Sequence, residues 1–207
     1  MTYNEKLVRT LAEIISSVIP DSETAARTLV LKYGTLDRIF AASQSALSEL
    51  DSLGYAGASY LRLISELLAR RNTDKFKFGI KHTDAEIDEY FVARLMPRSS
   101  EAVFVMSFDS FGRAIAADIV SEGVVNASEL FPRRVAEAAV KRGAASIVIA
   151  HNHPHGVAEF SEADMISTVT VAHILTTAGI KLVRHVVTAG NSSLSINLDE
   201  TAEKRQL

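Results

Sequence analysis

The sequence predicts an α/β protein in which a mixed β-sheet flanked by helices is preceded by a small all-α helical domain. Apolar residues recur at helical spacing over residues 5–72, and strand-like apolar runs begin only after residue 100. Those runs then alternate with further helical segments, as in sheets covered by helices. With 207 residues, 47% of them apolar, the chain is long enough for one ordinary domain and a small accessory domain.

The first half is predicted to consist of short helices. Its first helix is indicated by apolar residues at helical spacing: Leu7, Leu11, Ile14 and Ile15. A long helix is expected from Ala56 to Arg71, followed by a linker rich in Arg, Lys and Asp. We therefore expect a helical domain over residues 1–78 and a second domain over residues 79–207.

The second half is predicted to run in the order helix, two strands, helix, strand, helix, two strands. The expected helices are Asp84–Met96, Pro132–Gly143 and Ser161–Gly179. The expected strands are Ala102–Phe108 and Ala114–Val120, joined as a hairpin, then Ser146–Ala150, Lys181–Thr188 and Ser193–Ile196. This order predicts a mixed sheet covered by helices.

The composition excludes several classes of protein. A net charge of −3 gives no sign of a nucleic-acid coat or a polybasic membrane anchor. The chain has no cysteine, which excludes disulfide scaffolds, Fe–S clusters and thiol catalysis, so a metal site must use histidine and carboxylate ligands. The N-terminus does not resemble a signal peptide, and no apolar run is long enough to span a bilayer. We expect a cytoplasmic protein without a membrane partner.

The residues that follow the apolar run SIVIA predict a metal site. His151 and His153 are two positions apart, so in an extended segment their imidazoles face the same way and can chelate one cation. Ser161 and Asp164 have the spacing of a capping box at the start of the next helix. Asp164 could serve only as a helix cap, or, if the loop folds back, as a third ligand. Two histidines and a carboxylate would leave one position for water, as catalytic zinc sites require.

The stretch HNHPHGVAEFSEAD is similar to the His-x-His-Pro…Ser-x-x-Asp signature of the JAMM/MPN+ metalloprotease fold, and most closely to its bacterial RadC-like branch. The resemblance covers roughly residues 84–198. It implies an MPN/JAB fold, with Zn²⁺ held by His151, His153 and Asp164. It also implies a zinc-dependent hydrolase, a metallopeptidase or isopeptidase, that acts on a protein or peptide substrate. Zinc nucleobase deaminases have a similar layout but need cysteine ligands, which this chain lacks.

The same resemblance implies two catalytic residues. In the family, a glutamate at the start of the strand after the first helix binds the metal's water and acts as general base, and Glu101 occupies that place. Glu122, at the end of the next strand, is the competing candidate. Ser161 corresponds to the family serine that supports the oxyanion, a role compatible with its capping of a helix.

Several positions depart from the pattern of the branch. His155 stands where serine is usual, Arg133-Arg134 where Arg-Glu is usual, and Gly123-Val124 where Gly-Thr is usual. Arg184 replaces an aspartate before His185, so we expect His185 to have lost a hydrogen-bond acceptor. These changes leave the three expected ligands intact and concern specificity and turnover.

The segment LSELDSLGYAG, residues 47–57, resembles a helix-hairpin-helix, the N-terminal element of the same branch. Such hairpins offer backbone N–H groups to a DNA phosphate. Here Ser52 replaces the first glycine, and residues 1–77 hold ten Lys/Arg against nine Asp/Glu, which gives little counterion release. DNA binding through this hairpin is therefore weakly supported, and a structural or protein-docking hairpin is favoured.

Three functional hypotheses follow. The leading one is the zinc-dependent hydrolase. The alternative is a DNA-associated RadC-like module in which the metal site is structural or vestigial. The third, motivated by Arg184 and Val124, is an interaction scaffold that has lost activity.

Overall fold

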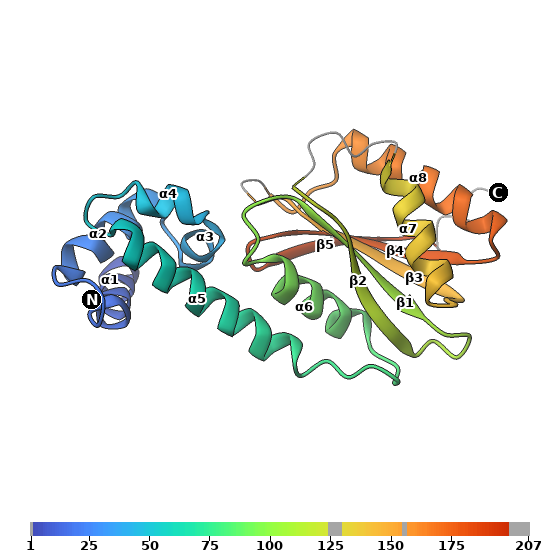
Figure 1. Cartoon of the computed structure of the whole chain (residues 1–207), viewed down its shortest axis with the longest axis horizontal. Coiled ribbons are helices and arrows are strands. Elements are labelled where there is room, and N and C mark those ends of the chain that lie inside the picture. Colours follow the sequence, from blue (N-terminus) through green and yellow to red (C-terminus); the bar gives the residue numbers. More distant parts are fainter. Residues whose placement is uncertain (1, 124–129, 155–156, 199–207) are drawn as a thin grey trace.

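Figure 1 shows a computed structural model of the chain, which describes residues 2–123, 130–154 and 157–198. The helical half contains α1 (Tyr3–Ile15), α2 (Ser22–Tyr33), α3 (Leu36–Ala41), α4 (Gln44–Ser48) and α5 (Gly54–Thr73). The sheet half contains α6 (Asp84–Leu95), β1 (Ala102–Phe108), β2 (Ala114–Glu122), α7 (Leu130–Lys141), β3 (Ser146–Asn152), α8 (Glu162–Thr177), β4 (Lys181–Ala189) and β5 (Ser192–Asn197). The predicted fold class is confirmed.

The helical half is built around one apolar cluster. Leu7, Leu11 and Ile15 recur every fourth residue on α1 and are buried in this cluster. Gly57 lets the start of α5 pack closely, because a Cβ atom there would lie 2.6 Å from Leu53 and 2.9 Å from Ile19. Helices α4 and α5 form the predicted helical hairpin, and DNA contact through it stays a prediction.

The described strands form one five-stranded sheet in the order β2-β1-β3-β4-β5. Strands β3 and β4 are parallel and are joined through α8, whereas the other neighbours are antiparallel. Helix α6 covers one face of the sheet, and α7 and α8 cover the other (Figure 1). Each face therefore has its own apolar cluster, and the central strands β1 and β3 are buried on both sides.

The strand before the histidines is longer than predicted. The expected strand ended at Ala150, but β3 continues to Asn152, so His151 lies within the strand rather than after it. His151 is paired with Val103 of β1 and Val187 of β4, and this pairing on both sides extends the strand through polar residues. His155 and Val124, two of the unusual positions in the sequence, lie outside the described residues.

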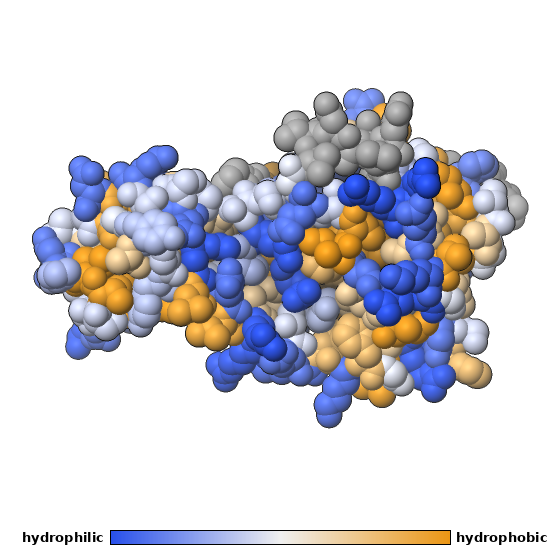
Figure 2. Space-filling view, viewed as in Figure 1, coloured by the Kyte–Doolittle hydropathy of each residue, from blue (hydrophilic) through white to orange (hydrophobic). Residues whose placement is uncertain are grey.

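The two halves meet along α5 and α6 and through a hydrogen bond from Asn191 to Asp37. Figure 2 shows mostly hydrophilic surface where they meet, with a smaller apolar area over α5. Phe76 packs with the sheet half through His82 and Tyr90, at ring-centroid distances of 3.8 and 4.6 Å. The domain division at residue 78 stays a prediction.

Over the described part of the chain, no helix has both the length and the apolar character needed to cross a membrane.

Candidate metal centre

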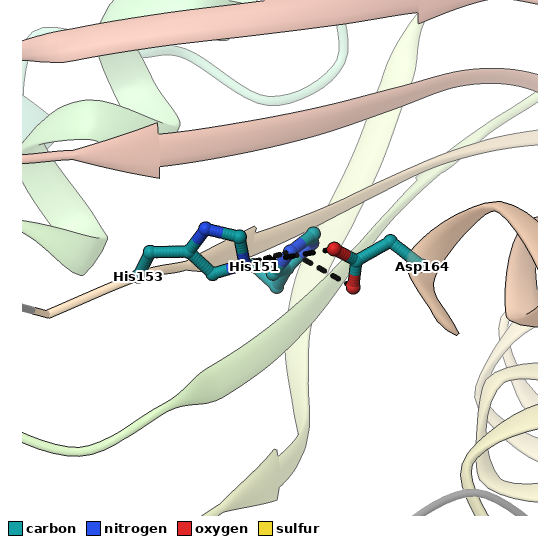
Figure 3. A group of neighbouring side chains, drawn as sticks. All are labelled: His151, His153 and Asp164. Atoms are coloured by element: carbon teal, nitrogen blue, oxygen red, sulfur yellow. Dashed lines mark hydrogen bonds and ion pairs between the residues drawn. The ribbon is translucent and has the colours of Figure 1, made fainter. Parts of the chain in front are cut away.

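Three of the predicted site residues converge on one point (Figure 3). His151 and His153 project from the end of β3, and Asp164 projects from the first turn of α8. The two Nε2 atoms are 3.1 Å apart, and the Asp164 carboxylate oxygens lie 3.2 Å from His151 Nε2 and 3.6 Å from His153 Nε2. Asp164 therefore lies beside both histidines, as the third-ligand alternative required.

The spacing of these atoms fits a tetrahedral metal ion. Ligands at about 2.0–2.1 Å from zinc in tetrahedral geometry lie about 3.3 Å from one another. The two Nε2 atoms, 3.1 Å apart, and the 3.2 Å from His151 Nε2 to Asp164 Oδ1 are close to that value, and His153 Nε2 lies 3.6 Å from the other carboxylate oxygen, Oδ2. Two imidazoles and one carboxylate are also a donor set that suits zinc and other transition metals better than magnesium or calcium. The residues present therefore fit the group that the sequence predicted.

A hydrogen-bond chain behind His151 fixes which of its nitrogens faces this point. The Thr168 hydroxyl donates its only proton to the carbonyl of Asp164 at 2.6 Å, so Thr168 Oγ1 accepts from His185 Nδ1, also at 2.6 Å. Burial, and then the neighbouring His151, lowers the pKa of His185 to about 3, so its ring is neutral. His185 Nε2 must then accept from His151 Nδ1, 2.9 Å away.

This chain leaves the Nε2 lone pair of His151 available to a cation. The Nε2 of His153 is likewise left with its lone pair, because its Nδ1 carries the proton and donates it to the carbonyl of Val157 at 3.1 Å. Both imidazoles thus turn Nε2 toward the Asp164 carboxylate. Three acceptor groups this close repel one another unless a cation or a proton lies among them, so the hydrogen bonds behind the ligands hold a group that could bind a cation.

Asp164 is held in its ionised form. Burial alone would raise the pKa of Asp164, but a protonated His151 in the metal-free protein and the hydrogen bonds from Ser161 outweigh it and hold the pKa far below its usual range. A cation on His151 Nε2 would take the place of that proton. Ser161 caps α8 in the predicted capping box. Its hydroxyl donates to Asp164 Oδ2 at 2.6 Å, and its backbone N–H donates to the same oxygen at 2.8 Å. In this structure Ser161 therefore orients the carboxylate of Asp164.

Glu101 is not part of the three-residue group. Val103 pairs with His151 across β1 and β3, so two residues earlier Glu101 comes level with His153, on the same face of the sheet. Glu101 is exposed, and no described residue forms a hydrogen bond or ion pair with its carboxylate. A catalytic role for Glu101 stays a prediction.

Asn152, which the sequence reasoning missed, fastens the segment that carries Glu101. Its side chain points away from those of its two histidine neighbours, as alternation along a strand requires. Its Oδ1 accepts from the N–H of Ala102 at 2.8 Å, and its Nδ2 donates to the carbonyl of Ser100 at 3.1 Å. Buried Asn152 therefore ties β3 to the residues on either side of Glu101.

Glu122, the competing candidate for the base, and Arg184, which stands where the branch has aspartate, both form ion pairs away from the metal centre. Glu122 forms an ion pair with Arg98. Arg184 points toward α6, where it pairs with Asp88 and, at 2.6 Å, with Asp84. The expectation that His185 lacks a hydrogen-bond acceptor is wrong, because Thr168 supplies one from α8.

Thr168 and Phe160 also escaped the sequence reasoning. Thr168 is four residues after Asp164, so helical spacing places it one turn further along the same face of α8. That spacing could have identified it. Phe160 packs edge-on against His151 and His185, at ring-centroid distances of 6.3 and 5.0 Å, and forms an apolar wall beside the ligands. No local pattern in the sequence indicated this contact.

Comparison with known proteins gives one consistent result. Residues 81–202 match the family model described as the RadC-like JAB domain. A UPF0758 protein of Xanthomonas campestris pv. campestris (strain 8004) is 33% identical over 177 residues, which cover 85% of this chain and 79% of the relative. UPF0758 proteins of Vibrio parahaemolyticus serotype O3:K6 and Photobacterium profundum are 30% and 28% identical, and the matches cover 81% and 83% of this chain and 75% and 77% of the relatives. The names of these relatives state no activity.

Proposed function

Because the chain belongs to the RadC-like JAB domain family, we propose that it is a zinc-dependent hydrolase that cleaves a peptide or isopeptide bond. The observation that supports this most is the convergence of His151, His153 and Asp164 with separations that suit a tetrahedral ion. Bound at this position, zinc supplies Lewis acidity, which acidifies water and polarises a carbonyl group.

The residues around the centre divide the remaining work. We assign the general base to Glu101, because no described residue pairs with its carboxylate and because continuing the β1–β3 register would bring it level with His153. It would take a proton from the attacking water and pass it to the leaving amine. Phe160 would limit access of bulk water on the side of His151.

Ser161 and Thr168 act in this proposal as positioning residues. Ser161 holds the carboxylate of Asp164, and Thr168 fixes the tautomers of His185 and His151. The oxyanion role predicted for Ser161 would require its hydroxyl to turn from Asp164 toward the substrate, since the hydroxyl has only one proton to donate.

The test combines metal analysis with turnover. We expect about one zinc per chain by elemental analysis, and its loss when His151 and His153 are replaced together by alanine. Glu101→Gln should keep the metal and abolish cleavage of peptide or isopeptide substrates in a pooled library. Glu122→Gln tests the competing candidate for the base and should not abolish cleavage, and Glu23→Gln, at an exposed carboxylate of α2, is the matched control. Full metal content in the double histidine variant, or cleavage that survives Glu101→Gln, would contradict the proposal.

A further inference from the structure

A groove separate from the metal centre lies between the helical half and the sheet half. It has a volume of about 590 Å³ and is formed by α5, the end of α6, the segment after α6 and the end of β2. Its charged lining residues are Arg62, Glu66, Arg70, Asp74, Arg94, Arg98 and Glu122. A groove of this size accommodates a small ligand or the end of a peptide.

The four arginines of this groove differ in their partners. Arg98 is paired with Glu122. Arg62 donates to the carbonyl of Phe40 at 3.2 Å and lies 3.9 Å from Glu66. Within the described ranges, no carboxylate lies at ion-pair distance from Arg70 or Arg94. Arg70 and Arg94 therefore have no ion-pair partner among the described residues.

Two of these guanidinium groups contact the ring of Phe104. The central carbons of Arg94 and Arg98 lie 5.3 and 5.2 Å from the centroid of its ring. The Nε atoms of both arginines are buried without a hydrogen-bond partner among the described residues. Arg94 and Arg98 thus bring two positive charges to one aromatic ring at this groove, and an anion in the groove would offset that charge.

We propose that this groove binds one oxyanion, a carboxylate or a phosphate, carried by a small ligand or by the end of a peptide. Guanidinium groups match both oxyanions through paired N–H donors, and Ser99 and Ser100 add hydroxyl donors to the lining. Four arginines against three carboxylates leave one net positive charge, which suits a single anionic group. The same carboxylates would repel an extended polyanion such as nucleic acid.

The groove adjoins the segment that leads to the metal centre. The carbonyl groups of Arg98 and Ser100 accept hydrogen bonds from Asn152, and Glu101 is the next residue. An anionic group in the groove would therefore lie beside the start of β1, and the acidic end of a peptide substrate is one source of it. That source rests on the proposed hydrolase function, whereas oxyanion binding does not.

Isothermal titration calorimetry of the full chain at constant ionic strength tests the proposal. Inorganic phosphate and glutarate are titrated separately, so that the two sources are distinguished, and saturable binding of either supports the site. Arg94→Gln and Arg70→Gln should each raise Kd about tenfold, because each removes a charge-assisted hydrogen bond. Arg27→Gln is the control, since Arg27 is exposed on α2 and paired with Glu23. Glu122→Gln should lower Kd, because it releases Arg98 from its carboxylate.

Three outcomes would overturn the proposal. One is the absence of saturable binding of both probes, and another is a Kd unchanged by Arg70→Gln and Glu122→Gln, which would place the anion elsewhere, at the metal centre included. The third is binding of duplex DNA, lost in Arg70→Gln, when neither small anion binds. If Arg94→Gln does not fold, Arg70→Gln and Glu122→Gln decide the question. Cleavage assays are not used, so this result is independent of the proposed hydrolase.

Discussion

Replacing Thr168 by valine should weaken zinc binding without removing any ligand. Thr168 is buried, and its hydroxyl is the acceptor for His185 Nδ1. Without metal, the variant can move the proton of His185 to Nε2, from where it is donated to His151 Nδ1, and no donor is left without an acceptor. Zinc on His151 Nε2 forbids this arrangement, because His151 must then carry its own proton on Nδ1.

The cost of the substitution therefore falls mainly on the metal-bound state. There, the buried N–H of His185 would face a valine methyl group, and a buried donor without a partner costs about 1–3 kcal/mol. At about 1.4 kcal/mol per factor of ten, zinc affinity should fall about 5-fold to 150-fold. The stability of the metal-free protein should change much less.

Competition with a chelating indicator measures this affinity. Thr168→Ser is the control, since it restores the hydroxyl and should recover most of the affinity. If Thr168→Val binds zinc within twofold of the wild type, the hydrogen-bond chain does not set the state of His151, and the assignment of its nitrogens is refuted.

Three further predictions concern the surrounding structure. Asn152→Ala should reduce the free energy of unfolding in urea by about 2 kcal/mol, because it leaves the buried N–H of Ala102 without its acceptor, while metal content is retained. Leu11→Ala, in the core of the helical half, should cost about 2–5 kcal/mol by the same measurement and leave zinc affinity unchanged; an altered affinity would contradict the separation of the two cores. Asp118→Asn should lower Tm at pH 7, and this difference should shrink as the pH falls below the unfolded pKa. A hydrogen bond from Arg142 lowers the pKa of Asp118 below its unfolded value of about 3.9, so the pair stabilises the fold above that pH and this stability is lost as the pH falls. A Tm difference that persists at acid pH would count against this pair.

The features that could be predicted from the sequence are those encoded locally. Strand β1 was predicted with its observed bounds, and Ser161 was identified as the cap of α8, because apolar runs and capping residues act within a few positions. The convergence of His151 and His153 also follows from their spacing along an extended segment. Each of these features is determined by residues that lie within a few positions of one another in the sequence.

The features that were missed depend on the order of the strands. Asn152 reaches Ser100 and Arg98, some fifty positions away, only because β3 lies next to β1. The error about His185 has a simpler cause. Adjacent residues of a strand face opposite sides of the sheet, so a side chain at position 184 does not face that of His185. The presence of Arg184 there therefore does not affect the hydrogen bonds of His185. The length of β3 was underestimated because polarity suggested a loop where two neighbouring strands impose pairing.

The unit formed by β3, α8 and β4 separates metal affinity from catalysis along the chain. His151, His153, Asp164, Thr168 and His185 all lie within one uninterrupted stretch of the sequence, from the end of β3 to the middle of β4. The proposed base, Glu101, belongs to a different stretch and is connected to the unit through Asn152. A homologue could therefore lose hydrolysis through change at one distant glutamate and still purify with a full complement of zinc. Under the proposed function, bound zinc would indicate an intact β3–α8–β4 unit, and turnover has to be measured separately.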